Sequence, residues 1–155
     1  MEAEKQSLIT PEAAKMVGME TGWGAPFRVE LGIAKKFAQA IRGADAGRSF
    51  SELTPENANG RVTVPHSILL CNMPTGSELD FNIPLRTKSR VRGGDELEML
   101  RPVNIGDVIR ASTKILSITE KEGRSGRMVF ILTETEYQNQ RKEAVMRSRT
   151  TVVKR

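Results

Sequence analysis

The most regular hydrophobic pattern in the chain lies between residues 30 and 42. Its apolar residues recur at the spacing of one face of a helix: Ile33, Ala34, Phe37, Ala38 and Ile41. Polar residues occupy the opposite face, so the pattern predicts an amphipathic helix over residues 30–42, with Gly43 placed to end it. Because such a helix has to bury its apolar face, we expect other elements to cover it.

The second half of the chain predicts an antiparallel sheet. Four runs are rich in β-branched residues or alternate in polarity: residues 96–100, 107–119, 128–137 and 144–153. Residues 122–126 and 138–142 separate the last three runs and predict hairpin loops. A short strand at 62–64 and a short apolar helix at 66–73 precede the runs. This order of elements predicts an α+β fold, in which a curved antiparallel sheet wraps around a central helix at residues 33–41.

The first 21 residues predict an N-terminal extension that contains a short helix. Thr10 is placed as its N-cap, Pro11 as its first residue and Gly18 as its end. Residues 44–60, rich in small and polar types, predict a long loop, and loops of this length are often functional. With 155 residues and no internal repeat, we expect one domain over residues 1–155.

Composition narrows the class of protein. The net charge of +5 favours ligands that carry phosphate or an acidic carrier protein, and the few aromatic residues form no stripe typical of nucleic-acid binders. No apolar run approaches the roughly 20 residues of a transmembrane helix, and the first residues lack a secretory pattern, so we expect a cytoplasmic protein with no membrane contact. Cys71 is the only cysteine, which excludes an internal disulfide, and its apolar neighbours predict that it is buried.

Four segments, taken in order, resemble the MaoC-like dehydratase family in its N-terminal, FAS1-like subgroup. They are GAPFRVE at 24–30, IAKKFAQAI at 33–41, VPHS at 64–67 and RPVNIGD at 101–107. The hairpin at 121–130, followed by residues 136–140, also fits this subgroup. The resemblance extends over residues 22–153, and the segment at 101–107 is its most specific part. It implies a hot-dog fold, in which a curved antiparallel sheet wraps around a central helix.

The resemblance also implies an enzyme, with hydration of an enoyl thioester or the reverse dehydration of a 3-hydroxyacyl thioester as its reaction. It implies no cofactor, because coenzyme A or an acyl carrier belongs to the substrate. The family's hot-dog domains pair, so the resemblance implies a homodimer or a heterodimer with another hot-dog subunit.

The sequence departs from the family at its catalytic pair, which lies in a D-x-N-P-x-H pattern after the helix. Gly43 stands at the aspartate position and Arg48 at the histidine position, and neither side chain exchanges a proton at working pH. Both positions are therefore expected to line the substrate site only. Asp45 lies two residues late, where it is either a replacement acid in a re-formed loop or an ordinary loop carboxylate.

His66, the only histidine, is the other candidate catalytic residue. In the alignment it takes the place of a glycine whose backbone N–H can hold the thioester carbonyl, at the start of a short helix. Three roles stay open: acid/base catalysis, lining of the substrate site together with Ser67, and a structural hydrogen bond.

The missing pair leaves three functional interpretations. The first is a hydratase or dehydratase subunit whose aspartate and histidine come from a partner hot-dog domain. The second is a non-catalytic subunit that binds acyl-coenzyme A, and the third is a thioesterase on the same fold. Four cations lie at residues 86–92. They predict binding of coenzyme A phosphates, binding of an acidic carrier, or, more commonly, a solvated, charged loop.

Overall fold

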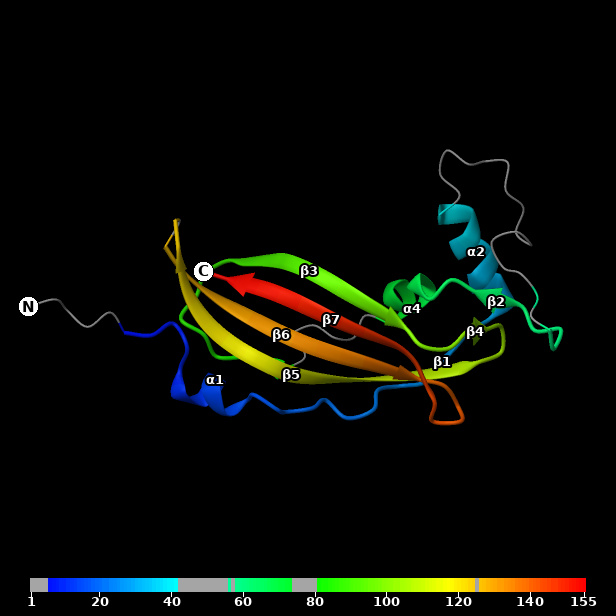
Figure 1. Cartoon of the computed structure of the whole chain (residues 1–155), viewed down its shortest axis with the longest axis horizontal. Helices are drawn as coiled ribbons and strands as arrows, with labels where there is room; N and C mark the ends of the chain where they lie inside the picture. The colour runs from blue at the N-terminus through cyan, green and yellow to red at the C-terminus, as the bar shows by residue number, and fades with distance from the viewer. Residues whose placement is uncertain (1–5, 42–55, 57, 74–80, 125) are drawn as a thin grey trace, which may run out of the picture.

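The computed structural model describes residues 6–41, 56, 58–73, 81–124 and 126–155, and its main element is a curved antiparallel sheet (Figure 1). The five strands lie in the order β1-β5-β6-β7-β3. Their bounds are β1 Phe27–Arg28, β5 Val108–Gly123, β6 Gly126–Gln138, β7 Ala144–Lys154 and β3 Arg90–Met99. The α+β class and the curved antiparallel sheet predicted from the sequence are therefore confirmed.

The two faces of this sheet differ in chemistry, because side chains alternate along each strand. On β6 the residues of one face are buried: Val129, Ile131, Thr133, Thr135 and Tyr137. The opposite face carries charged pairs between β6 and β7, with Arg147 Nε 2.9 Å from Glu136 Oε2 and Arg149 Nε 2.8 Å from Glu134 Oε2. The helices therefore pack on the first face.

Three helices and a small second sheet complete the described structure. The helices are α1 Pro11–Lys15, α2 Leu31–Ile41 and α4 Ser67–Asn72, and the small sheet pairs β2 Thr63–Val64 with β4 Val103–Asn104. Helix α1 begins as predicted, because the Thr10 side chain accepts a hydrogen bond from Ala13 N–H at 3.1 Å. No helix within the described residues is long and apolar enough to cross a membrane.

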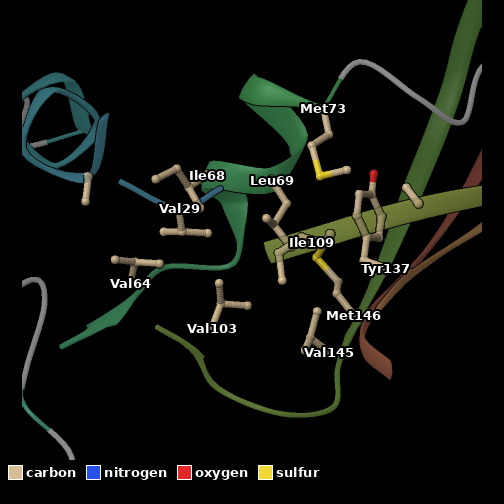
Figure 2. Packing of buried hydrophobic residues seen from close by; sticks show 12 residues of the cluster. Val29, Val64, Ile68, Leu69, Met73, Val103, Ile109, Tyr137, Val145 and Met146 are labelled. Atoms are coloured by element: carbon tan, nitrogen blue, oxygen red, sulfur yellow. The ribbon is translucent and has the colours of Figure 1, made fainter. Parts of the chain in front are cut away.

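The helix at the core of the fold is α4, and the expectation that residues 33–41 form the buried central helix is wrong. Ile68 and Leu69 of α4 are fully buried, and Figure 2 shows them among apolar side chains of the sheet and of β4. In α2 only Ala34 and Ala38 are buried, whereas the large side chain of Ile41 stays 46% exposed. Figure 1 shows the reason: α2 starts beside β1 and runs away from the long sheet.

The predicted strands are confirmed, but several of their ends differ: β5 continues to Gly123 and β6 begins at Gly126, so the loop predicted at 122–126 is shorter. Strand β3 begins at Arg90 rather than at residue 96, and its pairing with β7 shifts register between Arg92 and Gly94. Part of the basic run at 86–92 therefore belongs to an edge strand and not to a loop. The sequence interpretation also missed strand β4, which lies inside the RPVNIGD segment.

The N-terminal segment after α1 lies along the free edge of β5. Its backbone donates three hydrogen bonds to β5 carbonyls, from Gly18 to Ile115 at 2.8 Å, from Thr21 to Thr113 at 2.9 Å, and from Gly24 to Ala111 at 2.9 Å. These bonds hold residues 18–24 at a fixed place beside the sheet, and Trp23 is therefore held there as well.

Candidate functional site

His66 occupies the N-cap position of α4 and is half-buried. Its Nε2 lies 2.7 Å from the carbonyl oxygen of Arg101, which is the first residue of the RPVNIGD segment. A carbonyl only accepts hydrogen bonds, so Nε2 carries the hydrogen and the lone pair of the neutral ring lies on Nδ1. The imidazole is therefore oriented, with Nδ1 as the atom that can take up a proton.

The carbonyl that orients His66 belongs to a turn held by Asp107. Oδ2 of Asp107 accepts the backbone N–H of Asn104 at 2.8 Å, and Oδ1 accepts hydrogen bonds from Arg61 at 2.6 Å and Gln140 at 3.1 Å. Burial alone raises the pKa of Asp107, but these donors outweigh it and lower the pKa below the ordinary value. Asp107 therefore stays ionised and stabilises the turn, and it is unsuited to donate a proton.

Beside this turn lies a cavity of about 340 Å³, which we call the turn hollow. Among its lining residues are Arg61, Arg101, Asn139, Arg141 and Glu143. Hydrogen bonds from Asn139 and Arg141 lower the pKa of Glu143, so this carboxylate is ionised as well. The two carboxylates of the hollow, Asp107 and Glu143, are thus bound to cations and amides and do not form an acid/base pair.

The first residues of α4 offer backbone donors next to the imidazole. Ile68 N–H donates to Pro65 O at 3.1 Å and Leu69 N–H to His66 O at 3.0 Å, which closes the first turn. Within the described part of the chain, the N–H groups of His66 and Ser67 have no acceptor. Ser67 is exposed, and His66 beside it is half-buried.

The structure brings only part of the predicted site into view. Gly43, Asp45 and Arg48 lie outside the described residues, so their position relative to His66 stays a prediction. Cys71 is exposed, and the expectation that it is buried is wrong. Because α4 turns Ile68 and Leu69 into the core, Leu70 and Cys71, which follow directly, face outward.

A second cavity, of about 450 Å³, was not anticipated from the sequence, and we call it the Trp23 groove. It lies between the N-terminal segment, β5 and the hairpin of β6 and β7, and its lining residues are Trp23, Val108, Arg110, Gln138, Asn139, Gln140 and Lys142. These residues are far apart in the sequence, so no local pattern indicates that they meet. Among the described residues, no three of histidine, cysteine, aspartate and glutamate gather as a metal site.

The family described as "FAS1-like, dehydratase domain region" matches residues 15–148 of the chain. The match includes the turn at 101–107 and the whole of α4 with His66. A comparison with curated protein sequences gives no match.

Many solved structures are similar to the chain, and three of them illustrate the likeness. One chain of the truncated HadBC complex, a 3R-hydroxyacyl-ACP dehydratase from Mycobacterium tuberculosis, is 22% identical with a TM-score of 0.66, covering 89% of this chain and 96% of that one. A MaoC-like dehydratase from Rhodospirillum rubrum is 24% identical with a TM-score of 0.59, covering 89% and 91%. A chain of the ChsH1-ChsH2 complex from Mycobacterium tuberculosis is 15% identical with a TM-score of 0.67, covering 92% and 94%. These likenesses show that the predicted hot-dog fold is correct.

Proposed function

Since the chain belongs to the family of FAS1-like dehydratase domains and has the hot-dog fold, we propose that it acts on acyl thioesters as one subunit of a hydratase or dehydratase. The observation that carries this proposal is the start of α4. An oriented imidazole and two backbone N–H groups lie together there, in a chain that matches a dehydratase family over residues 15–148.

Hydration of an enoyl thioester needs three things: donors for the carbonyl oxygen as negative charge develops on it, a base for the attacking water, and an acid for the carbon that becomes protonated. The N–H groups of His66 and Ser67 suit the first task, because they point from the first turn of a helix and have no acceptor in the described residues. Nδ1 of His66 suits either lining of the substrate or proton transfer. No cofactor enters this scheme, since coenzyme A or the carrier is part of the substrate.

The described residues do not supply a complete acid/base pair. Asp107 and Glu143 are held ionised by their donors, and the family's aspartate and histidine positions hold Gly43 and Arg48. We therefore propose that a partner hot-dog subunit supplies the aspartate and histidine, while Gly43 and Arg48 line the acyl group. Two of the similar structures are themselves named as complexes of two subunits, HadBC and ChsH1-ChsH2, which supports this division.

The test is a hydration assay of the purified chain alone. It measures the decrease in absorbance as the enoyl thioester of crotonyl-coenzyme A is hydrated. The isolated chain is expected to hydrate it poorly or not at all. Robust turnover that survives the double change His66→Ala and Asp45→Asn would contradict the assignment of the site. The product is identified as well, because a 3-hydroxyacyl thioester indicates hydration, whereas free coenzyme A indicates a thioesterase.

A matched pair of variants decides the role of His66 in any activity that is observed. His66→Gln keeps an N–H donor for the Arg101 carbonyl but cannot exchange a proton, whereas His66→Ala loses both functions. If the ring only orients and lines the site, the glutamine variant retains most of the activity and the alanine variant does not. Equal and complete loss in both variants assigns proton transfer to the histidine.

A further inference from the structure

The Trp23 groove contains an exposed indole on a backbone segment that is hydrogen-bonded to β5. Trp23 is 47% exposed, although the hydrogen bonds of Thr21 and Gly24 to β5 hold the backbone on both sides of it. The backbone bonds fix the place of Trp23 beside β5, and its exposed indole presents a flat aromatic surface there. Such a surface suits a ligand that also has a flat ring, because stacked aromatic groups attract each other.

Two cations lie beside the indole in the same groove, and both are exposed. Arg110 belongs to β5, and Lys142 belongs to the hairpin between β6 and β7. Among the described residues no carboxylate forms an ion pair with either of them. Glu136 pairs with Arg147 instead, and Glu143 pairs with Arg141. The charges of Arg110 and Lys142 are therefore available to an anionic ligand.

The floor of the groove is held in place before any ligand binds. Gln140 Oε1 accepts the Val108 N–H at 3.0 Å, and its Nε2 donates to Asp107 at 3.1 Å. The Asn139 side chain donates to Glu143 at 2.9 Å and accepts the Arg141 N–H at 2.9 Å. Since these amides are already engaged, the indole and the two cations are the groups left to recognise a ligand.

We propose that the Trp23 groove binds the nucleotide end of coenzyme A. An adenine ring stacks on Trp23, and Arg110 and Lys142 bind the phosphates, so that both chemical parts of the nucleotide meet a matching group. This proposal rests on the proposed function, because it takes the substrate to be a coenzyme A thioester. A thioester on an acyl carrier protein has no adenine and leaves the groove unused.

The groove lies on the same end of the molecule as His66. It shares Asn139 with the turn hollow, and the hollow is lined by Arg101, whose carbonyl binds His66. In Figure 1 the hairpin of β6 and β7, strand β4 and helix α4 all lie at the right-hand end. A ligand anchored by its nucleotide at Trp23 therefore lies next to the turn hollow, at the same end of the molecule as α4.

The test uses the intrinsic fluorescence of Trp23, which is the only tryptophan in the chain. Coenzyme A and adenosine 3′,5′-bisphosphate are expected to quench it in a saturable way, whereas pantetheine and inorganic phosphate at equal concentration leave it unchanged. Free tryptophan amide titrated in parallel corrects for absorption by the ligand. Absence of saturable quenching by both nucleotides, or equal quenching by pantetheine, overturns the proposal.

Charge variants test the phosphate contacts. Arg110→Gln and Lys142→Asn are each expected to weaken coenzyme A binding about tenfold, the factor for loss of one charge-assisted hydrogen bond. Asparagine is chosen because Lys142 has a φ of 61°, which asparagine tolerates. Lys35→Gln removes an exposed charge from α2 and is the matched control. Undiminished binding in both groove variants, or an equal loss in the control, contradicts the assignment.

Kinetics separate failure of this proposal from failure of the proposed function. In an active complex, the two groove variants are expected to raise KM for crotonyl-coenzyme A about tenfold and to leave KM for crotonyl-pantetheine unchanged. Equal effects on both substrates refute a nucleotide site in the groove. Quenching by coenzyme A, with no hydration even when the partner hot-dog subunit is present, would refute the proposed function and leave the nucleotide site intact.

Discussion

Asp107 is the residue whose removal gives the sharpest test of the site's architecture. It is 2% exposed and accepts hydrogen bonds from the Asn104 backbone, from Arg61 and from Gln140. Through the turn that contains these bonds, it supports the Arg101 carbonyl that orients His66. The change Asp107→Ala removes both carboxylate oxygens, and with them the acceptors of all these hydrogen bonds.

The cost of this change follows from what is left behind. The buried Asn104 N–H loses its acceptor, which costs about 1–3 kcal/mol. The ion pair with Arg61 adds at most about 1 kcal/mol, because the arginine side chain is 35% exposed to solvent. A total of about 3 kcal/mol corresponds to a drop in Tm of roughly 6–12 °C for a chain of this size.

Asp107→Asn is the matched control, because it keeps an oxygen for the Asn104 N–H but loses the charge. We expect it to cost about 1–2 kcal/mol, less than the alanine variant. Urea unfolding followed by circular dichroism measures both differences. The reasoning is refuted if Asp107→Ala costs less than about 0.5 kcal/mol, the range of ordinary surface changes, or if asparagine costs more than alanine.

The difference in stability between the native protein and Asp107→Asn is expected to depend on pH. The folded state lowers the pKa of Asp107, so its stabilising contribution is fully present above the ordinary aspartate pKa of about 3.9. It is lost as the pH falls from there through the lowered folded value. The stability difference between the native protein and Asp107→Asn is therefore expected to shrink in acid, and a difference that grows in acid contradicts the assignment.

Two further pairs of variants test the fold. Ile68→Ala is expected to lower the free energy of unfolding by about 3 kcal/mol, because this side chain of α4 is fully buried. Leu31→Ala on α2 is expected to lower it by less than about 1 kcal/mol, because Leu31 is 46% exposed. Urea unfolding that gives the opposite order contradicts α4 as the core helix. Thr10→Ala removes the acceptor for the Ala13 N–H and is expected to cost about 1 kcal/mol, while Thr10→Ser keeps it and costs little. Equal stability of the two Thr10 variants in thermal unfolding rules out the cap.

The helices show what periodicity in a sequence predicts and what it does not. The stripe of Ile33, Ala34, Phe37, Ala38 and Ile41 predicted α2 within about a residue of its ends. The same stripe says only that one face is apolar, and the depth of burial depends on how much of the sheet lies against it. Helix α4 has six residues, too few for a period, although its Ile68 and Leu69 are fully buried in the core.

The surroundings of His66 and the Trp23 groove depend on contacts between residues that are far apart in the sequence, more than the helices do. The partner that orients His66 is a backbone carbonyl of Arg101, and a carbonyl leaves no trace in the amino-acid sequence. The Trp23 groove forms because Gly24 bonds to Ala111 and because a hairpin brings Lys142 near β5. The resemblance to the dehydratases predicted the fold and the chemical class, but neither of these arrangements.

The central claim is that this chain binds the acyl thioester and lines its site, while a partner hot-dog subunit performs the proton transfers. Its most direct test is the hydration rate of crotonyl-coenzyme A by the chain, by a companion subunit with an intact D-x-N-P-x-H segment, and by the two together. The account predicts a rate for the pair that far exceeds the sum of the separate rates and that vanishes when the companion's aspartate is replaced. A pair no faster than the companion alone would contradict it.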